Sequence, residues 1–163
     1  MTGIRRCTGE ERTAILAVVN AAASAYRGVI PEDRWHEPYM DLDELENEIA
    51  AGVAFWGYEK EGELIGVMGV QPMDDVDLIR HAYVLPGSQR HGVGAALLEH
   101  LRRQTVRRML VGTWTAAEWA IRFYRRNGFE LAHRSGEAEP PSATNVVGNV
   151  CFQGSLHPEL GDS

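Results

Sequence analysis

One stretch decides the fold: Leu78-Ile-Arg-His-Ala-Tyr-Val-Leu-Pro-Gly-Ser-Gln-Arg-His-Gly-Val-Gly-Ala-Ala-Leu-Leu98. Its first part, Leu78 to Leu85, is apolar and rich in β-forming residues, which predicts a strand that Pro86-Gly87 ends. Gln89 to Ala95 then opens a helix, whose apolar residues fall on one face. Glycines at a helix start leave backbone N–H groups aimed at one point. The stretch therefore predicts an anion site, and phosphate is the usual anion.

Spacing separates three kinds of phosphate-binding loop at this position. Gly87 to Gly92 has the glycine spacing of a Walker A loop, but Val93-Gly94 stand where that loop needs Lys followed by Ser or Thr. The dinucleotide fingerprint needs a third small residue, and Leu97 occupies that place. What remains is Gln/Arg-x-x-Gly-x-Gly/Ala after a strand that ends in Val-x-Pro. For a glycine pair taken alone, a structural turn is the alternative.

This combination resembles the GCN5-related N-acetyltransferases (GNAT), whose motif of this form binds the pyrophosphate of acetyl-CoA. A second segment, Trp119-Ala-Ile-Arg-Phe-Tyr-Arg-Arg-Asn-Gly-Phe129, matches the Ala-x-x-hydrophobic-Tyr-x-x-x-Gly-Phe pattern that closes the CoA site in the same family. The resemblance covers Ile4 to His133. It implies an α/β (α+β) single-domain GNAT fold, a mixed and mostly antiparallel sheet of about six to seven strands flanked by about four helices.

The resemblance also implies roles for individual residues. Val84 would offer its backbone N–H to the thioester carbonyl as an oxyanion donor. Tyr124 would be the general acid for the leaving thiolate, with a core tyrosine on an amphipathic helix as the alternative. Ala117 replaces an Asn that the family uses to contact the cofactor. The residues implied in binding acetyl-CoA through pantetheine or pyrophosphate are Tyr83, Val84, Leu85, Gln89, Arg90, His91, Gly92, Val93, Gly94 and Ala95.

The pattern does not identify the general base. Family members often place Glu or His on the strand before the phosphate loop, at positions that hold Leu78 and Arg80 here, and neither serves at neutral pH. Glu59, Asp77, His81 and a water chain stay open, while Glu118 is better explained as a capping residue. His81 is expected on the opposite face if the strand is regular. Arg80 could instead hold a substrate carboxylate.

The acceptor side is expected between the first two helices, because that region covers the acceptor in the family. Exposed aromatic residues in loops often carry function. Packing of a long loop onto the core is the alternative. The candidate acceptor residues are Tyr26, Arg27, Trp35 and Tyr39, together with Arg80.

The remaining elements follow from local signals. Thr8 with Glu11, Asp41 with Glu44 and Thr115 with Glu118 have the capping-box spacing and predict three helix starts, and Gly52 is expected just after the second helix. Two apolar runs around Lys60 to Glu63 predict an antiparallel hairpin. The other strands are expected at 4–7, 109–114 and 129–133. The domain is expected over 1–133, and 134–163 is a tail with a weak last strand at 145–152 or disorder.

Composition limits the function classes. The 163 residues fit one domain, and their net charge of −7 argues against a general nucleic-acid binder. No run approaches the roughly 18 apolar residues of a membrane span, and no signal peptide is expected. Cys7 and Cys151 lack metal or redox spacing, so the sequence implies no metal and a reducing cytoplasm. Two groups of arginines, 102–108 and 122–126, predict solvated helix faces or attraction for the CoA 3′-phosphate.

Together these observations predict an acetyl-CoA-dependent N-acetyltransferase, monomeric or homodimeric, that acts on a primary amine of a small molecule or peptide. Direct attack in a ternary complex is expected, because no cysteine lies near the motifs to form an acyl-enzyme. The alternative is a non-catalytic acyl-CoA-binding sensor, since a base is not evident.

Overall fold

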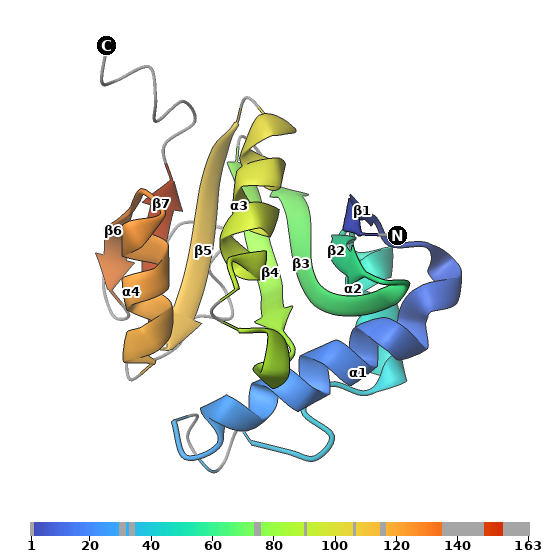
Figure 1. Ribbon diagram of the computed structural model, residues 1–163. Helices are drawn as coiled ribbons and strands as arrows, with labels where there is room; N and C mark the ends of the chain where they lie inside the picture. Colours follow the sequence, from blue (N-terminus) through green and yellow to red (C-terminus); the bar gives the residue numbers. More distant parts are fainter. Residues whose placement is uncertain are drawn as a thin grey trace. The chain divides into compact units, whose positions relative to one another are not determined.

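The computed structural model describes residues 2–29, 32, 35–73, 76–89, 91–105, 107–114, 117–134 and 149–154. The chain divides into two compact units, one of Met1–Gln71 with Arg80–Leu101 and one of Pro72–Ile79 with Arg102–Ser163. Both units draw on strand β4 (Val76–Val84), because their boundary falls between Ile79 and Arg80. Figure 1 labels the helices and strands along the chain.

The first unit is built on strands β1 (Gly3–Arg6), β2 (Ala54–Lys60), most of β3 (Glu63–Met73) and the end of β4, in that order. β1 pairs antiparallel with β2, with Ile4 opposite Tyr58, and β2 pairs antiparallel with β3, with Trp56 opposite Met68. Glu61 and Gly62 connect β2 to β3 with positive φ at both positions, 53° and 83°. Two such residues match the twist of a hairpin, so the predicted hairpin is confirmed.

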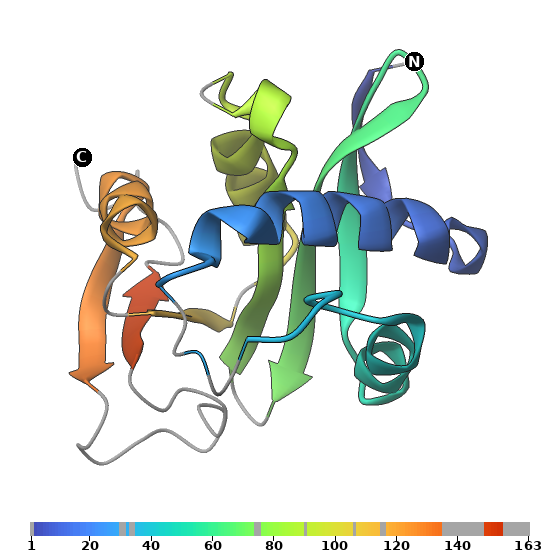
Figure 2. The same cartoon turned by 90° about the horizontal axis from the view of Figure 1, so that it is seen from below.

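Helices α1 (Arg12–Ala23) and α2 (Leu42–Ala50) cover one face of these strands. Ile15, Val18 and Val19 of α1 share a buried cluster with Leu45 of α2 and Val67 of β3, and α1 runs across the strands in Figure 2. Asp41 caps α2 by accepting the Glu44 N–H at 2.8 Å, and Gly52 follows with φ 106°. Both signals were expected from the sequence. Short 3₁₀ turns, η1 (Gly9–Glu11) and η2 (Ser24–Tyr26), flank α1.

Helix α3 (Val93–Arg103) packs on the other face of β3. A Cβ placed on Gly66 would lie 2.8 Å from Val93 Cγ1 and 3.3 Å from Leu97 Cδ1. Val67, next along β3, faces the α1 cluster instead, as the alternation of a strand requires. The missing side chain at Gly66 therefore lets the start of α3 lie close against the sheet.

The second unit contains the start of β4, then β5 (Arg108–Trp114), α4 (Glu118–Arg126), β6 (Phe129–Arg134) and β7 (Asn149–Gly154). Its strand order is β4-β5-β7-β6. β4 is parallel to β5, and β7 is antiparallel to both β5 and β6. The candidate last strand at 145–152 overlaps β7, while residues 145–148 lie outside the described ones. Seven described strands and four α-helices confirm the expected fold class.

Helix α4 begins later than the capping box at Thr115 predicts. Ala117 is its N-cap, with φ −84° and ψ 71°, and the Ala117 carbonyl accepts the N–H groups of Ala120 and Ile121. Since ψ at Ala117 is not helical, Glu118 is the first helical residue. Thr115 itself lies outside the described residues.

Candidate active site

The predicted phosphate loop lies between the end of β4 and the start of α3. Leu85 N–H donates to the Ile65 carbonyl at 2.8 Å, and the 3₁₀ turn η4 (Pro86–Ser88) follows. The Gln89 side-chain amide turns back and donates to the Val84 carbonyl at 3.1 Å. Arg90 lies outside the described residues, and His91 is exposed. Gln89 thus fixes the loop to the strand end through its side chain.

The start of α3 has the backbone geometry of an anion site. At the start of α3, Ala96 N–H donates to the Gly92 carbonyl at 2.9 Å. The amides of residues 93–95 therefore belong to the first turn of the helix, where the helix itself supplies no hydrogen-bond acceptor. Gly92 has φ 76°, which favours glycine, and the space where its Cβ would stand is open. The Val93 side chain is buried, so Val93 can meet an anion only through its backbone.

Strand β4 is irregular where the sequence analysis expected a regular strand. Its parallel pairing with β5 covers Val76 to Ile79. Two residues further along, His81 has φ 55°, the left-handed conformation that non-glycine residues rarely adopt. His81 was expected on the face opposite Arg80 only for a regular strand, and this φ shows that the strand is not regular at His81. Both side chains reach Glu48 of α2.

A polar network surrounds Glu48. Its Oε1 lies 3.2 Å from His81 Nε2 and 3.3 Å from Arg80 Nη2. Arg80 Nη1 also donates to Gln71 Oε1 at 3.0 Å, and Gln71 donates to the Ala51 carbonyl at 2.9 Å. The close contact with His81 holds the Glu48 pKa below its ordinary value, against the opposing effect of burial, and the charges of His81 and Arg80 add to the lowering. Arg80, a candidate contact for the acceptor substrate, therefore already pairs with Glu48 and Gln71.

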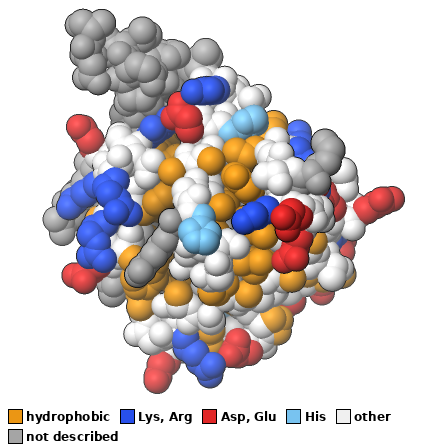
Figure 3. Space-filling model, in the orientation of Figure 1, with side chains coloured by type: hydrophobic (Ala, Val, Ile, Leu, Met, Phe, Trp, Pro, Cys, Tyr) orange, Lys and Arg blue, Asp and Glu red, His pale blue; other side chains and the backbone are white. Residues whose placement is uncertain are grey.

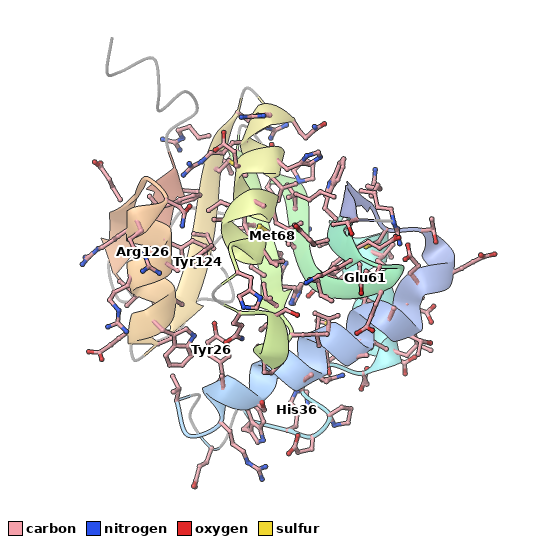
Figure 4. All side chains as sticks on the ribbon, viewed as in Figure 1. Tyr26, His36, Glu61, Met68, Tyr124 and Arg126 are labelled. Carbon is pink, nitrogen blue, oxygen red and sulfur yellow. The ribbon has the colours of Figure 1, made fainter. Side chains whose placement is uncertain are left out.

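Three of the four candidate acceptor-site residues between the first two helices lie in one aromatic cluster with Tyr83. Its ring lies edge-on to Tyr26 and Tyr39, with centroids 6.2 and 6.1 Å away, and its hydroxyl donates to that of Tyr39 at 3.2 Å. Trp35 lies 5.6 Å from Tyr39. Arg27 instead forms an exposed ion pair with Glu37 at 3.2 Å. Figure 4 labels Tyr26 after α1 and His36, which stacks on Tyr39, before α2.

Asn20 of α1 holds the chain just before α2 in place. Its side-chain amide donates to the Met40 carbonyl at 2.9 Å, and its side-chain oxygen accepts the Met40 N–H at 2.8 Å. The Asn20 amide therefore pairs with Met40 as a neighbouring strand would. Met40 is buried directly after Tyr39, so the pair sets the position of the Tyr39 ring. No sequence pattern points to Asn20 or Glu48, because a polar residue in an amphipathic helix is ordinarily part of its solvated face.

The other candidate bases are engaged elsewhere. Glu59 Oε1 accepts from Arg5 Nε at 2.7 Å, and Arg5 also binds both oxygens of Glu11. In the second unit, Asp77 is buried and lies 3.4 Å from Arg107 Nε. Each of these two carboxylates therefore has an arginine as its partner.

Tyr124 of the second unit is buried between two aromatic rings. The Phe123 and Phe129 centroids lie 5.2 and 5.7 Å from its own. Next to it, the buried Arg102 donates to the Asn127 carbonyl and lies 4.9 Å above the Phe129 ring. The prediction that Arg102 belongs to a solvated face is wrong, because its guanidinium closes the end of α4. Arg122, Arg125 and Arg126 are nevertheless exposed on α4, and Figure 3 shows basic side chains gathered at the surface.

Cys7 does not have the properties of a nucleophile. Burial raises the pKa of its thiol to about 11, so the thiol is protonated at neutral pH. Of Cys151, the structure describes the backbone in β7. Within the described ranges, no helix is long and apolar enough to cross a membrane.

The sequence of this chain is similar to those of known acetyltransferases. A family model described as an acetyltransferase (GNAT) domain matches residues 51–131. YjgM of Escherichia coli K12, an uncharacterized N-acetyltransferase, is 28% identical over 136 residues, which cover 78% of this chain and 81% of that protein.

Two solved structures have similar folds. A GNAT-family acetyltransferase of Staphylococcus aureus Mu50 has a TM-score of 0.74 at 18% identity, with 96% of this chain and 99% of that one covered. The PaiA N-acetyltransferase of Thermoplasma acidophilum, solved with coenzyme A, has a TM-score of 0.74 at 18% identity, with 95% and 99% covered. At this identity the likeness shows the fold.

Proposed function

The chain belongs to the GNAT acetyltransferase family, and we propose that it transfers the acetyl group of acetyl-CoA to a primary amine of a small molecule or peptide. The observation that carries the proposal is the start of α3. A left-handed Gly92 with open space beside it precedes first-turn amides that need an outside acceptor. We place the reaction in the cytoplasm, where cysteines such as Cys7 stay reduced.

The residues around the end of β4 fit acetyl-CoA as a substrate. The backbone from Gln89 to Ala95 would hold the pyrophosphate, helped by the positive end of the α3 dipole. The strand residues Tyr83, Val84 and Leu85 would hold the pantetheine. Val84 lies beyond the stretch of β4 that pairs with β5, which supports its N–H as the donor to the thioester oxygen. The likeness to a structure solved with coenzyme A adds support.

The proposed transfer is direct. The amine nitrogen attacks the thioester carbon, the C–N bond forms, the C–S bond breaks, and the thiolate leaves with a proton from Tyr124. A phenol with an ordinary pKa near ~10 is a protonated donor at neutral pH. The protonated thiol of Cys7 supports a route without an acyl-enzyme. Tyr26, Trp35 and Tyr39 would form a wall of the acceptor site, because Tyr26 and Tyr39 pack against Tyr83 of β4 and Trp35 packs against Tyr39.

The test combines acetyl-CoA binding with turnover. Calorimetry measures acetyl-CoA affinity, and thiol-reactive dye detects CoA release across a panel of amines, diamines and peptides. We expect Tyr124→Phe to lower kcat about 10²-fold, the lower range for acid catalysis, with acetyl-CoA Kd unchanged. Tyr58→Phe on β2 is the matched control. Equal turnover in Tyr124→Phe would remove the assignment. Acetyl-CoA binding by the wild-type protein without turnover on any amine would support the sensor function instead.

A further inference from the structure

The aromatic cluster of Tyr26, Trp35, Tyr39 and Tyr83 lies beside the strand end that would hold the thioester. Tyr83 directly precedes Val84 in β4, and its ring contacts Tyr26 edge-on. Tyr39 contacts the same ring, and Trp35 lies against Tyr39. All four residues are half-buried, so each keeps part of its surface open to solvent. A partly open apolar surface that separate segments build together is typical of a ligand site.

The protein itself holds the rings of this cluster in place. The Tyr83 hydroxyl donates to the Tyr39 hydroxyl at 3.2 Å, and both residues pack on the buried cluster of α1, α2 and the sheet. Asn20 of α1 holds Met40, the residue after Tyr39, through two hydrogen bonds. His36, labelled in Figure 4, stacks on Tyr39 with the two ring planes 12° apart. Because these rings are already positioned, a ligand that binds them loses little conformational entropy on their account.

The described charged groups around this segment fall into two sets. The first set is exposed to solvent, where ion pairs contribute little to binding. It consists of Glu32, the pair of Arg27 with Glu37 at 3.2 Å, and His36 with Glu44 at 3.8 Å. The second set is the less exposed pair of Arg80 and Glu48 at 3.3 Å, in which the two charges cancel. Neither set therefore gives the aromatic cluster a strong charge for a ligand to pair with.

This charge balance determines which kind of acceptor fits the cluster. A polyamine would bring a second ammonium against the rings, and an amino acid would bring a carboxylate. A charged group that leaves water without a partner is unfavourable. An uncharged aromatic ring carries no such penalty, and it can add an edge-to-face contact like those that Tyr83 makes with Tyr26 and Tyr39.

We propose that the acceptor is a primary amine that carries an uncharged aromatic ring on a short alkyl chain, and that this ring binds against the aromatic cluster. The inference rests on the proposed function and names its substrate class. With the ring beside Tyr83, the amine nitrogen would lie near Val84 and attack the thioester carbon there. The C–N bond forms and the C–S bond breaks. Of the two protons that the ammonium gives up, one passes to solvent and the other ends on the CoA thiol.

Matched amines test the substrate class through CoA release. Phenylethylamine is the reference compound. Phenylalanine adds a carboxylate to it, an aminomethyl group on the ring adds a second ammonium, and butylamine lacks the ring. We expect kcat/KM for phenylethylamine to exceed that for each of the others by about 10–10²-fold, the range over which an apolar site discriminates. A diamine, amino acid, peptide or butylamine used as well as phenylethylamine would overturn the inference and leave the proposed function standing.

Variants of Tyr39 connect this preference to the cluster. Tyr39→Leu keeps an apolar side chain but removes the ring, so KM for phenylethylamine should rise about 3–10-fold, the contribution of one aromatic contact. KM for butylamine and the acetyl-CoA Kd should not change. Tyr39→Phe keeps the ring and should restore the wild-type KM, and Tyr58→Leu of β2, outside the cluster, is the matched control. If Tyr39→Leu does not fold, Tyr26→Leu takes its place. An equal KM for phenylethylamine in the Leu variant and wild type counts against the cluster as the ring site.

A second measurement does not depend on turnover. Calorimetry with the protein–CoA complex compares two acetylated compounds, N-acetylphenylethylamine and N-acetylphenylalanine, which differ by one carboxylate. The uncharged compound should bind at least about tenfold more tightly, and Tyr39→Leu should weaken its binding. Equal affinities for the two compounds would refute the inference alone. A wild-type protein that releases no CoA with any amine would refute the proposed function, and the inference with it.

Discussion

The Asn20–Met40 pair offers the sharpest test of how the chain before α2, which carries Trp35 and Tyr39, is held against α1. Asn20→Ala removes two hydrogen bonds of 2.8 and 2.9 Å from a buried backbone unit. At about 1 kcal/mol each, the loss is about 2 kcal/mol, with water replacing part of it because Asn20 is half-buried. With a urea m-value of about 2 kcal/mol/M, the unfolding midpoint should move down by about 1 M.

Asn20→Asp separates the two bonds. The carboxylate still accepts the Met40 N–H, but its second oxygen then stands about 2.9 Å from the Met40 carbonyl oxygen, where Asn20 placed a donor. Only the protonated acid can donate there, so folding raises the pKa of Asp at this position above its ordinary value of about 3.9. The stabilising contribution is therefore present below that value and is lost as the pH rises through the folded pKa.

The assay compares urea unfolding of wild type and Asn20→Asp at pH 4 and pH 7, followed by tryptophan fluorescence. The penalty of the variant should be clearly smaller at pH 4. Asn47→Asp, exposed on α2, should show a change within about 0.5 kcal/mol at both pH values. A penalty for Asn20→Asp that is equal at both pH values would refute the reasoning, as would Asn20→Ala with wild-type stability.

Three further outcomes follow from the structure. Arg5 holds the pKa of Glu11 down to about 2, so this pair stabilises the fold above the ordinary Glu pKa, and its contribution is lost as the pH falls toward 2. Glu11→Gln should therefore flatten the acid part of the plot of stability against pH, measured by acid titration of circular dichroism. Gly66→Ala should cost about 1–3 kcal/mol, because its Cβ would stand 2.8 Å from Val93 Cγ1, and adding Val93→Ala should recover part of it in a double-mutant cycle; no recovery would place the strain elsewhere. Gly92→Ala, at φ 76°, should weaken acetyl-CoA binding in calorimetry, whereas Gly87→Ala, with open space and no positive φ, should not; equal affinities would argue against the loop as the pyrophosphate site.

Local signals predicted most of the elements because each depends on a few adjacent residues. The two-residue turn at Glu61-Gly62 and the Asp41 cap are of this kind, and the structure confirms them. The predicted start of α4 was wrong. Thr115 and Glu118 have the spacing of a capping box, but the backbone at Ala117 is not helical, so the helix begins after it.

What the sequence could not predict depends on contacts between distant segments. Glu48 and His81 are 33 positions apart in the chain, and neither position has a pattern that points to the other. The left-handed His81 is likewise invisible in a run of β-forming residues, because the strand signal carries no information about a single irregular φ. In the sequence, Arg102 is one of several arginines of a helix that could all face solvent. Its role depends on the Asn127 carbonyl at the end of α4, which accepts a hydrogen bond from the Arg102 guanidinium.

The position of β7 has a consequence for how the chain is made. In the second unit, β7 lies between β5 and β6, although it follows both in sequence. While the chain emerges from the ribosome, β5 and β6 are complete before the strand that joins them exists, so each carries an edge of unpaired N–H and C=O groups during that interval. Such edges are the surfaces on which nascent chains associate wrongly. The synthesis of β7, up to Gly154, is therefore the step that removes these edges, and a chain released before it would keep two strands open to pairing with other molecules.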